Sequence, residues 1–381
     1  MKILWIFVIF LCPFGFFSCT KYDEIGTKID DDYYCKPPTE KRDTTPNEEY
    51  EEYDEYFKHQ WHLNAQCFSI NIIPAWEITK GAGVKVAILD DGIQKNHEDF
   101  ENIKVYNILD QSDNCEPTAK TIYSHGTAVA GVLAARQNGI GTIGVAPECD
   151  LLFIGDNSEC LYSSDDIVIK AFEYAKNWGA QVISCSWGSY NVSSSLSSEI
   201  RRLYDDGIVI VFACGNDKKN MDIYNINDES ELPWVIGVSS SDENGELAAS
   251  FSNYGSNIDI MAPGTSILSL DLMGAEGSNN GMEFVNQNYR FCRGTSFSAP
   301  IVAGVAALIL ADNPSLTPKE VYNIITQTAQ KTGNVQYDAN GFSLRHAYGL
   351  IDAAAAINAN GGMIKKIIGQ DKKSQKNNVT A

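Results

Sequence analysis

Short runs of aliphatic and β-branched residues recur along the chain, and each ends at a glycine or a polar residue. Residues 84–89 and 207–212 are two such runs, and their continuous apolar character is typical of strands buried in a parallel sheet. Asp90 follows the first run directly, and Asn216 lies just after the second. Because chemistry in open α/β sheets gathers at the carboxyl ends of the strands, Asp90 is a candidate for a functional site.

A longer apolar run, residues 301–310, consists of small and aliphatic residues and predicts a buried helix. Ser296 precedes this run after a turn that Gly294 begins, so its hydroxyl should lie at the positive end of the helix dipole. We expect Pro300 in the first helical turn, where its missing N–H needs no partner. A nucleophile fits the position of Ser296, and so does a serine-rich N-cap without chemistry.

A histidine opens a second helix of small residues, at 125–132. The chain has five histidines, and His125 has the setting of a general base. Taken alone, such a residue is more often a helix cap or a satisfied core residue. Asp90, His125 and Ser296 follow one another with gaps of 35 (125 − 90) and 171 (296 − 125) residues, and three such elements in this order are hard to obtain by chance.

At these segments the chain resembles the subtilisin-like serine proteases, whose catalytic residues follow the order Asp, His, Ser. The resemblance covers residues 54 to 358 and implies an α/β fold: a subtilisin-like three-layer domain with a mostly parallel central sheet. It implies that Ser296 attacks the scissile carbonyl, that His125 moves the proton, and that Asp90 orients the imidazole. This chemistry requires no organic cofactor.

The resemblance also implies an oxyanion site and a substrate groove. The Asn216 amide would stabilise the developing charge together with the Ser296 N–H, although a turn asparagine is the alternative. The substrate would pair as an extended strand with two segments of the chain. The residues predicted to contact it there are Gly155, Ser186, Trp187 and Gly188. Ordinary strands that end in glycine turns are the alternative.

Specificity is suggested by the sequence around Asp90, which resembles the kexin and furin branch of the family. In that branch a second aspartate faces the side chain before the cleaved residue, and Asp91 matches it. Another acid lines the primary specificity pocket, and Asp222 is the candidate. Other acids of the branch are replaced here by Ile122, Asn191 and Ser195, so full dibasic specificity is not expected.

A calcium loop is the third implication of the resemblance. Residues 137–147 match the family segment in which an asparagine side chain and alternate carbonyls supply oxygen ligands, here Asn138, Ile140 and Thr142. Asp54 and Asp99 stand where the pattern has two further carboxylates, and such hard oxygen ligands suit Ca²⁺. The alternative is a glycine-rich surface loop with two unrelated acids.

The chain ends lie outside the expected catalytic domain at 54–360. Residues 1–18 read as a signal peptide of the lipoprotein type, because a short apolar run ends just before Cys19, which would carry the lipid. Residues 19–53 form an acidic linker, and 361–381 a polar, Lys-rich tail. We therefore expect an extracytoplasmic bacterial lipoprotein, periplasmic or on the outer-membrane surface; an ordinary secreted protein is the alternative.

Composition narrows the range of partners. A net charge of −20 and a pI near 4.6 argue against nucleic acid and anionic membranes, so the lipid on Cys19 would be the only membrane contact. A monomer is expected. Ten cysteines do not fix a pairing, although Cys149 with Cys160 is a plausible local bridge in an oxidising compartment.

Together these observations predict a lipid-anchored, calcium-stabilised serine endopeptidase that acts on extracytoplasmic proteins or peptides. One alternative is a dedicated processing protease with a basic-residue preference. The other is a catalytically silent scaffold that binds without cleaving, against which the complete set of Asp90, His125, Asn216 and Ser296 argues.

Overall fold

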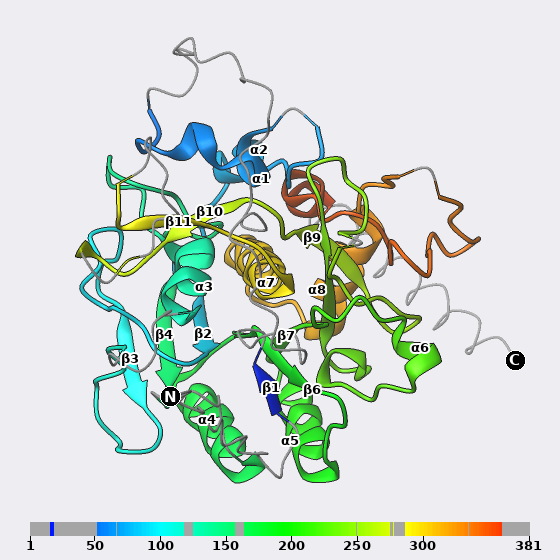
Figure 1. Cartoon of the computed structure of the whole chain (residues 1–381), viewed down its shortest axis with the longest axis horizontal. Coiled ribbons are helices and arrows are strands. Elements are labelled where there is room, and N and C mark those ends of the chain that lie inside the picture. Colours follow the sequence, from blue (N-terminus) through cyan, green and yellow to red (C-terminus); the bar gives the residue numbers. More distant parts are fainter. Residues whose placement is uncertain are drawn as a thin grey trace, which may run out of the picture.

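A seven-stranded parallel sheet forms the centre of the computed structural model (Figure 1). The model describes residues 16–18, 52–65, 67–117, 125–156, 164–248, 250–274, 277, 286–333 and 335–359. In sheet order the strands are β3 (Lys104–Asn107), β4 (Asp150–Gly155), β2 (Lys85–Leu89), β5 (Val182–Cys185), β7 (Val209–Ala213), β8 (Ile236–Ser241) and β9 (Ile260–Pro263). Every neighbouring pair is parallel, as the continuous apolar runs predict.

Helices cover both faces of this sheet, and alternate strand residues pack against different helices. Val86 and Ile88 belong to the hydrophobic core formed with α3 (His125–Ala134) and α7 (Thr295–Asp312). Ala87 and Leu89 belong to a second core, formed with α4 (Asp165–Trp178) and α5 (Ser194–Asp205). Figure 1 shows α3 and α7 above the sheet and α4 and α5 below it. The predicted three-layer α/β fold is confirmed.

The helix α7 is the longest helix among the described residues. Its 18 residues are hydrophobic enough to cross a membrane, but 89% of the helix is buried inside the domain, which identifies it as a core helix. Glycine in this helix allows the Val145 side chain to approach: a Cβ at Gly304 would lie 2.6 Å from the Cβ of Val145. Pro300 lies inside the helix, so its predicted position in the first turn is wrong.

Smaller elements surround the sheet. A hairpin of β10 (Ile267–Leu270) and β11 (Tyr289–Cys292) packs near α3, and α8 (Pro318–Thr328) begins with a capping box at Thr317. Short strands β1 (Phe16–Ser18) and β6 (Trp187–Ser189) form an antiparallel pair. The single-turn helices are η3 (Phe57–His59), α1 (Trp61–Asn64), α2 (Ile73–Trp76), α6 (Met221–Tyr224) and η4 (Glu229–Glu231).

The expected limits of the catalytic domain, residues 54 and 360, remain a prediction. Phe57 is fully buried in the core near its start, and residues 353–359 are helical near its end. Cys19, nearly all of the acidic linker, and the tail lie outside the described residues, as does Ile122.

The suggested bridge between Cys149 and Cys160 is contradicted. Cys149 carries a free, fully buried thiol, and Cys160 lies outside the described residues. The physical reason is that Cys149 precedes β4, whose six residues carry the chain about 20 Å away from it.

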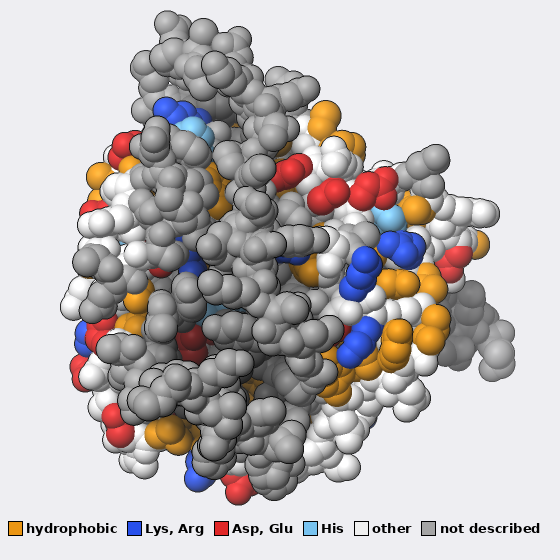
Figure 2. All heavy atoms as spheres, in the orientation of Figure 1, with side chains coloured by type: hydrophobic (Ala, Val, Ile, Leu, Met, Phe, Trp, Pro, Cys, Tyr) orange, Lys and Arg blue, Asp and Glu red, His pale blue; other side chains and the backbone are white. Residues whose placement is uncertain are grey.

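On the face of the domain shown in Figure 2, the described residues carry a mixture of hydrophobic, basic and acidic side chains. A group of Lys and Arg side chains lies at its right, beside hydrophobic and acidic side chains. This basic group is a local feature, because the chain as a whole has a net charge of −20.

Candidate active site

A buried carboxylate and a histidine meet at the carboxyl end of β2. Asp90 follows β2 and is fully buried, and its Oδ1 lies 2.8 Å from Nδ1 of His125, the first residue of α3. Burial alone lowers the pKa of His125, but the charge and hydrogen bond of Asp90 outweigh this and raise that pKa above its usual value. The pair fixes the imidazole with Nε2 turned away from Asp90.

Ser296 is the second residue of α7 and is joined to Ser186 by two hydrogen bonds. The Ser296 hydroxyl donates to the Ser186 carbonyl oxygen at 3.3 Å, and the Ser186 hydroxyl donates to the Ser296 carbonyl oxygen at 2.7 Å. In a regular helix the Ser296 carbonyl would accept from the N–H four residues later, but that residue is Pro300, which has none. The proline therefore leaves this carbonyl available to Ser186.

The hydroxyl of Ser296 and the imidazole of His125 are not hydrogen-bonded to each other in the structure. His125 Nε2 is buried and lacks a hydrogen-bond partner within the described chain. The two residues are nevertheless neighbours, since the His125 ring lies 5.6 Å from the ring of Phe297, which follows Ser296.

The Asn216 amide is held in one orientation beside the start of α7. Its Oδ1 accepts hydrogen bonds from the Thr295 N–H at 2.9 Å and the Thr295 hydroxyl at 3.0 Å. A backbone N–H can only donate, so the oxygen faces Thr295 and Nδ2 remains as a donor. A Cβ at Gly294 would lie 3.4 Å from Nδ2, and glycine at this position, where φ is 132°, leaves the space open.

The residues predicted to line the substrate groove come from two segments: Gly155 ends β4, Trp187 and Gly188 lie in β6, and Ser186 lies between β5 and β6. Trp187 points into the core, where its Nε1 donates to the Leu89 carbonyl at 2.9 Å, so its ring does not face a groove. Gly188 lies on β6, where β1 pairs with it in an antiparallel register. Gly155 ends β4, and a Cβ there would approach the Asp91 carbonyl oxygen to 2.9 Å.

The two predicted specificity acids both have local hydrogen-bond partners. Asp91 Oδ1 accepts from the N–H groups of Gly92 at 2.5 Å and Gly126 at 2.9 Å, which places it at the start of α3. Burial and the neighbouring Asp90 raise the pKa of Asp91 to about 7. Asp222 is exposed, and its carboxylate accepts from the hydroxyl and the N–H of Ser256 at 2.6 and 3.0 Å.

Two acids that sequence reasoning did not select lie against β6. The Glu229 carboxylate accepts from the Ser189 N–H at 2.7 Å and the Ser189 hydroxyl at 2.9 Å, and Asp228 lies beneath Gly188. Both acids are almost completely buried. In sequence they belong to the acidic stretch 227–231, which looks like a solvated loop, so polarity alone gave no signal of their burial.

The predicted calcium ligands are brought into one loop cluster. Asp54 accepts from the N–H groups of Asn138 at 3.1 Å and Gly139 at 2.6 Å, and Asp99 Oδ2 accepts from the Thr142 N–H at 2.9 Å. The amide oxygen of Asn138 accepts from the Ile140 N–H at 3.1 Å. Asp99 Oδ1 is buried without a hydrogen-bond partner among the described residues, and burial raises the pKa of Asp99 to about 7. An unpartnered buried carboxylate oxygen fits a cation.

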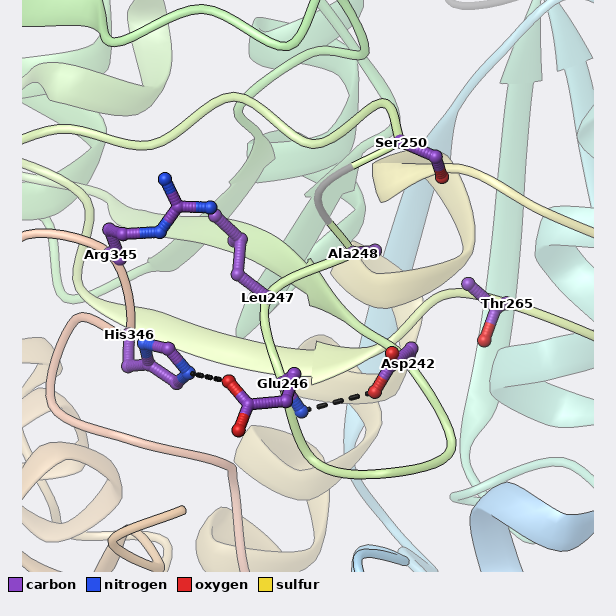
Figure 3. A pocket seen from close by; sticks show the side chains of 8 residues that line it. All are labelled: Asp242, Glu246, Leu247, Ala248, Ser250, Thr265, Arg345 and His346. Atoms are coloured by element: carbon purple, nitrogen blue, oxygen red, sulfur yellow. Dashed lines mark hydrogen bonds and ion pairs between the residues drawn. The ribbon is translucent and has the colours of Figure 1, made fainter. Parts of the chain in front are cut away.

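A separate pocket of about 400 Å³ lies away from these residues. Its lining comes from the segments around residues 242–250 and 345–346, together with Thr265 (Figure 3). Within it His346 points toward Glu246, and their Nε2 and Oε2 atoms lie 2.9 Å apart. None of the predicted site residues lines it, so this pocket is not the candidate active site.

Comparison with known proteins places this geometry in a family. The model of the subtilase family matches residues 81–350. Subtilisin DY of Bacillus licheniformis is 33% identical over 263 residues, which cover 69% of this chain and 89% of the subtilisin. Fervidolysin of Fervidobacterium pennivorans is 30% identical over 301 residues, 74% of this chain but 42% of fervidolysin.

A solved structure shows the same similarity in three dimensions. A protease of Pseudoalteromonas arctica superimposes with a TM-score of 0.69 and 30% sequence identity, covering 81% of this chain and 99% of its own. The family match spans the strands and helices that carry Asp90, His125, Asn216 and Ser296. The chain therefore belongs to the subtilase family and is a serine endopeptidase.

Proposed function

We propose that the chain hydrolyses peptide bonds through Asp90, His125 and Ser296. The observation that carries this proposal is the buried Asp90–His125 pair, 2.8 Å apart, next to the helix whose second residue is Ser296. A buried carboxylate on Nδ1 holds the imidazole in one tautomer and stabilises it when it gains a proton. A histidine held in this way is a general base.

The reaction begins with a rotation of the Ser296 side chain, from the Ser186 carbonyl toward His125 Nε2. The imidazole takes the hydroxyl proton as Ser296 Oγ bonds to the scissile carbonyl carbon. The Asn216 amide and the Ser296 N–H donate to the oxyanion that forms. The imidazolium then protonates the leaving amine, and water, activated by the same histidine, releases the acyl group.

The substrate binds as an extended chain along β6. In support, the edge of β6 accepts an antiparallel strand, since β1 pairs there with Phe17 opposite Gly188. Gly188 and Gly155 lack side chains where the two substrate-binding segments end, so a second backbone can approach. The substrates are proteins or peptides outside the cytoplasm.

A calcium ion stabilises the domain at the loop cluster of Asp54, Asp99 and Asn138. The carboxylates, the amide oxygen and the carbonyl groups of Ile140 and Thr142 would hold it. The unpartnered Oδ1 of Asp99 supports the proposal, because a cation would neutralise this buried charge.

The exported protein is anchored by a lipid on Cys19 after removal of residues 1–18. The apolar run before Cys19 supports this proposal, as does the acidic segment that would separate the lipid from the domain. The domain then acts as a monomer outside the cytoplasm.

Loss of the nucleophile should abolish catalysis. We expect a soluble chain that starts near Thr20 to react with a fluorophosphonate probe and to cleave casein, and we expect Ser296→Ala to do neither. Asn216→Ala should lower kcat by about 10²–10³ with little change in KM, the loss measured for a comparable donor in a subtilisin. Equal casein hydrolysis by the wild type and Ser296→Ala would refute the proposed mechanism.

The pH profile should report the raised pKa of His125. The base must be neutral to accept a proton, so kcat/KM should rise with pH and reach half its maximum above 6.5, the ordinary pKa of histidine. Asp90→Asn removes the charge that raises this pKa, so the rise of kcat/KM should move to lower pH while the maximal rate falls. Asp91→Asn is the control for the neighbouring acid. If the rise of kcat/KM with pH disappears in this variant, the group that titrates is Asp91 and not His125.

Chelation of calcium should lower the melting temperature. An ion at 100 times its Kd stabilises the folded state by about 2.7 kcal/mol, which corresponds to a shift of about 5 °C in a domain of this size. Asp99→Asn should not respond to chelator, whereas Asp113→Asn, at an exposed acid, should respond like the wild type. Identical melting curves of the wild type with and without chelator would exclude a structural ion.

Replacement of Cys19 should release the protein from membranes. In a Gram-negative host the wild type should fractionate with membranes and incorporate labelled palmitate, and Cys19→Ala should do neither. Cys35→Ala, in the proposed linker, is the matched control and should behave as the wild type. Unlabelled wild-type protein in the soluble fraction would favour the secreted alternative.

A further inference from the structure

The segment that contains β6 presents two faces, and one of them faces the nucleophile. Successive residues of a strand point to opposite sides. Trp187 points into the core toward Leu89, so Ser186 and Gly188 share the other face. On that face the Ser186 hydroxyl bonds the carbonyl of Ser296. The side-chain direction of Gly188 is therefore on the side of the chain that carries the nucleophile.

The carboxylate of Asp228 lies directly against this face at Gly188. A Cβ on Gly188 would lie 2.6 Å from Oδ2 of Asp228 and 3.0 Å from its Oδ1. Oδ1 accepts from the Ser230 N–H at 3.0 Å and the Ser230 hydroxyl at 2.7 Å. Oδ2 has no hydrogen-bond partner in the described part of the chain, although Asp228 is only 6% exposed.

The adjacent Glu229 has a different task. Both of its carboxylate oxygens accept from Ser189, one from the N–H and one from the hydroxyl, so it fixes β6 to η4. Because this bond directs the Ser189 N–H inward, the N–H and carbonyl of Gly188 face the opposite edge, where β1 pairs. Glu229 thus holds the strand while Asp228 keeps one oxygen available.

The two acids have no counter-ion among the described side chains. Within the described residues no Lys, Arg or His forms an ion pair with Asp228 or Glu229. Burial, and then the charge of Glu229, raise the pKa of Asp228 well above its usual value. A buried carboxylate without a counter-ion is costly, so a cation that reaches it gains a strong partner.

We propose that Asp228 selects a Lys or Arg side chain at the substrate residue before the cleaved bond. An extended substrate on the edge of β6 places that side chain on the face shared by Ser186 and Gly188, where Oδ2 of Asp228 lies without a partner. The proposal rests on the proposed endopeptidase function and names its substrate class. It assigns to Asp228 the part that the sequence suggested for Asp222, which is exposed and bonded to Ser256.

Paired peptides that differ only before the cleaved bond, Lys in one and Gln in the other, test the proposal. The wild type should prefer Lys in kcat/KM by about tenfold or more, the size expected for a close charge pair at an interface. Asp228→Asn keeps the shape but removes the charge, so the preference should fall to near unity while Lys-peptide hydrolysis drops. Asp222→Asn, the matched control, should keep the wild-type preference.

A second measurement covers the case in which Asp228→Asn does not fold. Benzamidine, a small cation, should slow fluorophosphonate labelling of wild-type Ser296, whereas its neutral analogue benzamide should not. Three results would each overturn the role of Asp228. The first is a wild type that reacts with the fluorophosphonate but shows no preference for Lys, and the second is a Lys preference that survives in folded Asp228→Asn. The third is equal labelling of wild-type Ser296 in the presence of benzamidine and of benzamide. Wild type that neither labels nor cleaves any peptide would instead overturn the proposed function.

Discussion

The burial of α7 against the parallel sheet is the constraint on which the rest of the site depends. This helix packs on strands of the sheet and on α3 with nearly its whole surface, and its second residue is Ser296. The same packing sets the distance from Ser296 to the strand ends that carry Asp90 and Asn216. The stability of the domain and the geometry of the active site are therefore not separable, because one set of apolar contacts provides both.

The elements that the sequence predicted well are those whose signals are local. Continuous apolar runs predicted β2 and β7, and runs of small residues predicted α3 and α7. The signal is clear because an element that is buried on all sides is apolar at nearly every position. The Asp90–His125 contact was expected from the resemblance to the subtilisin-like serine proteases, in which the aspartate orients the imidazole. The orientation of Asn216 was expected only in outline, since the Thr295 contact that fixes it joins residues 79 apart.

The contacts that the sequence did not predict depend on tertiary packing. Asp228 and Glu229 look like members of a solvated acidic run, and only the return of this segment beneath β6 buries them. Pro300 was expected at the helix start, because sequence rules place proline there, whereas the structure keeps it inside and uses its missing N–H to free the Ser296 carbonyl. Cys149 was paired by proximity in sequence, which ignored the strand that follows it.

The position of Ser296 at the start of a core helix has a consequence for the order in which the active site is completed. The polypeptide is synthesised from its amino end, so Asp90 and His125 are made long before the segment that forms α7. Without α7 the sheet lacks most of one covering layer, and no nucleophile is present. Proteolytic activity therefore begins only when this late segment has been made and has packed, so the growing chain carries no active nucleophile while most of the domain is synthesised.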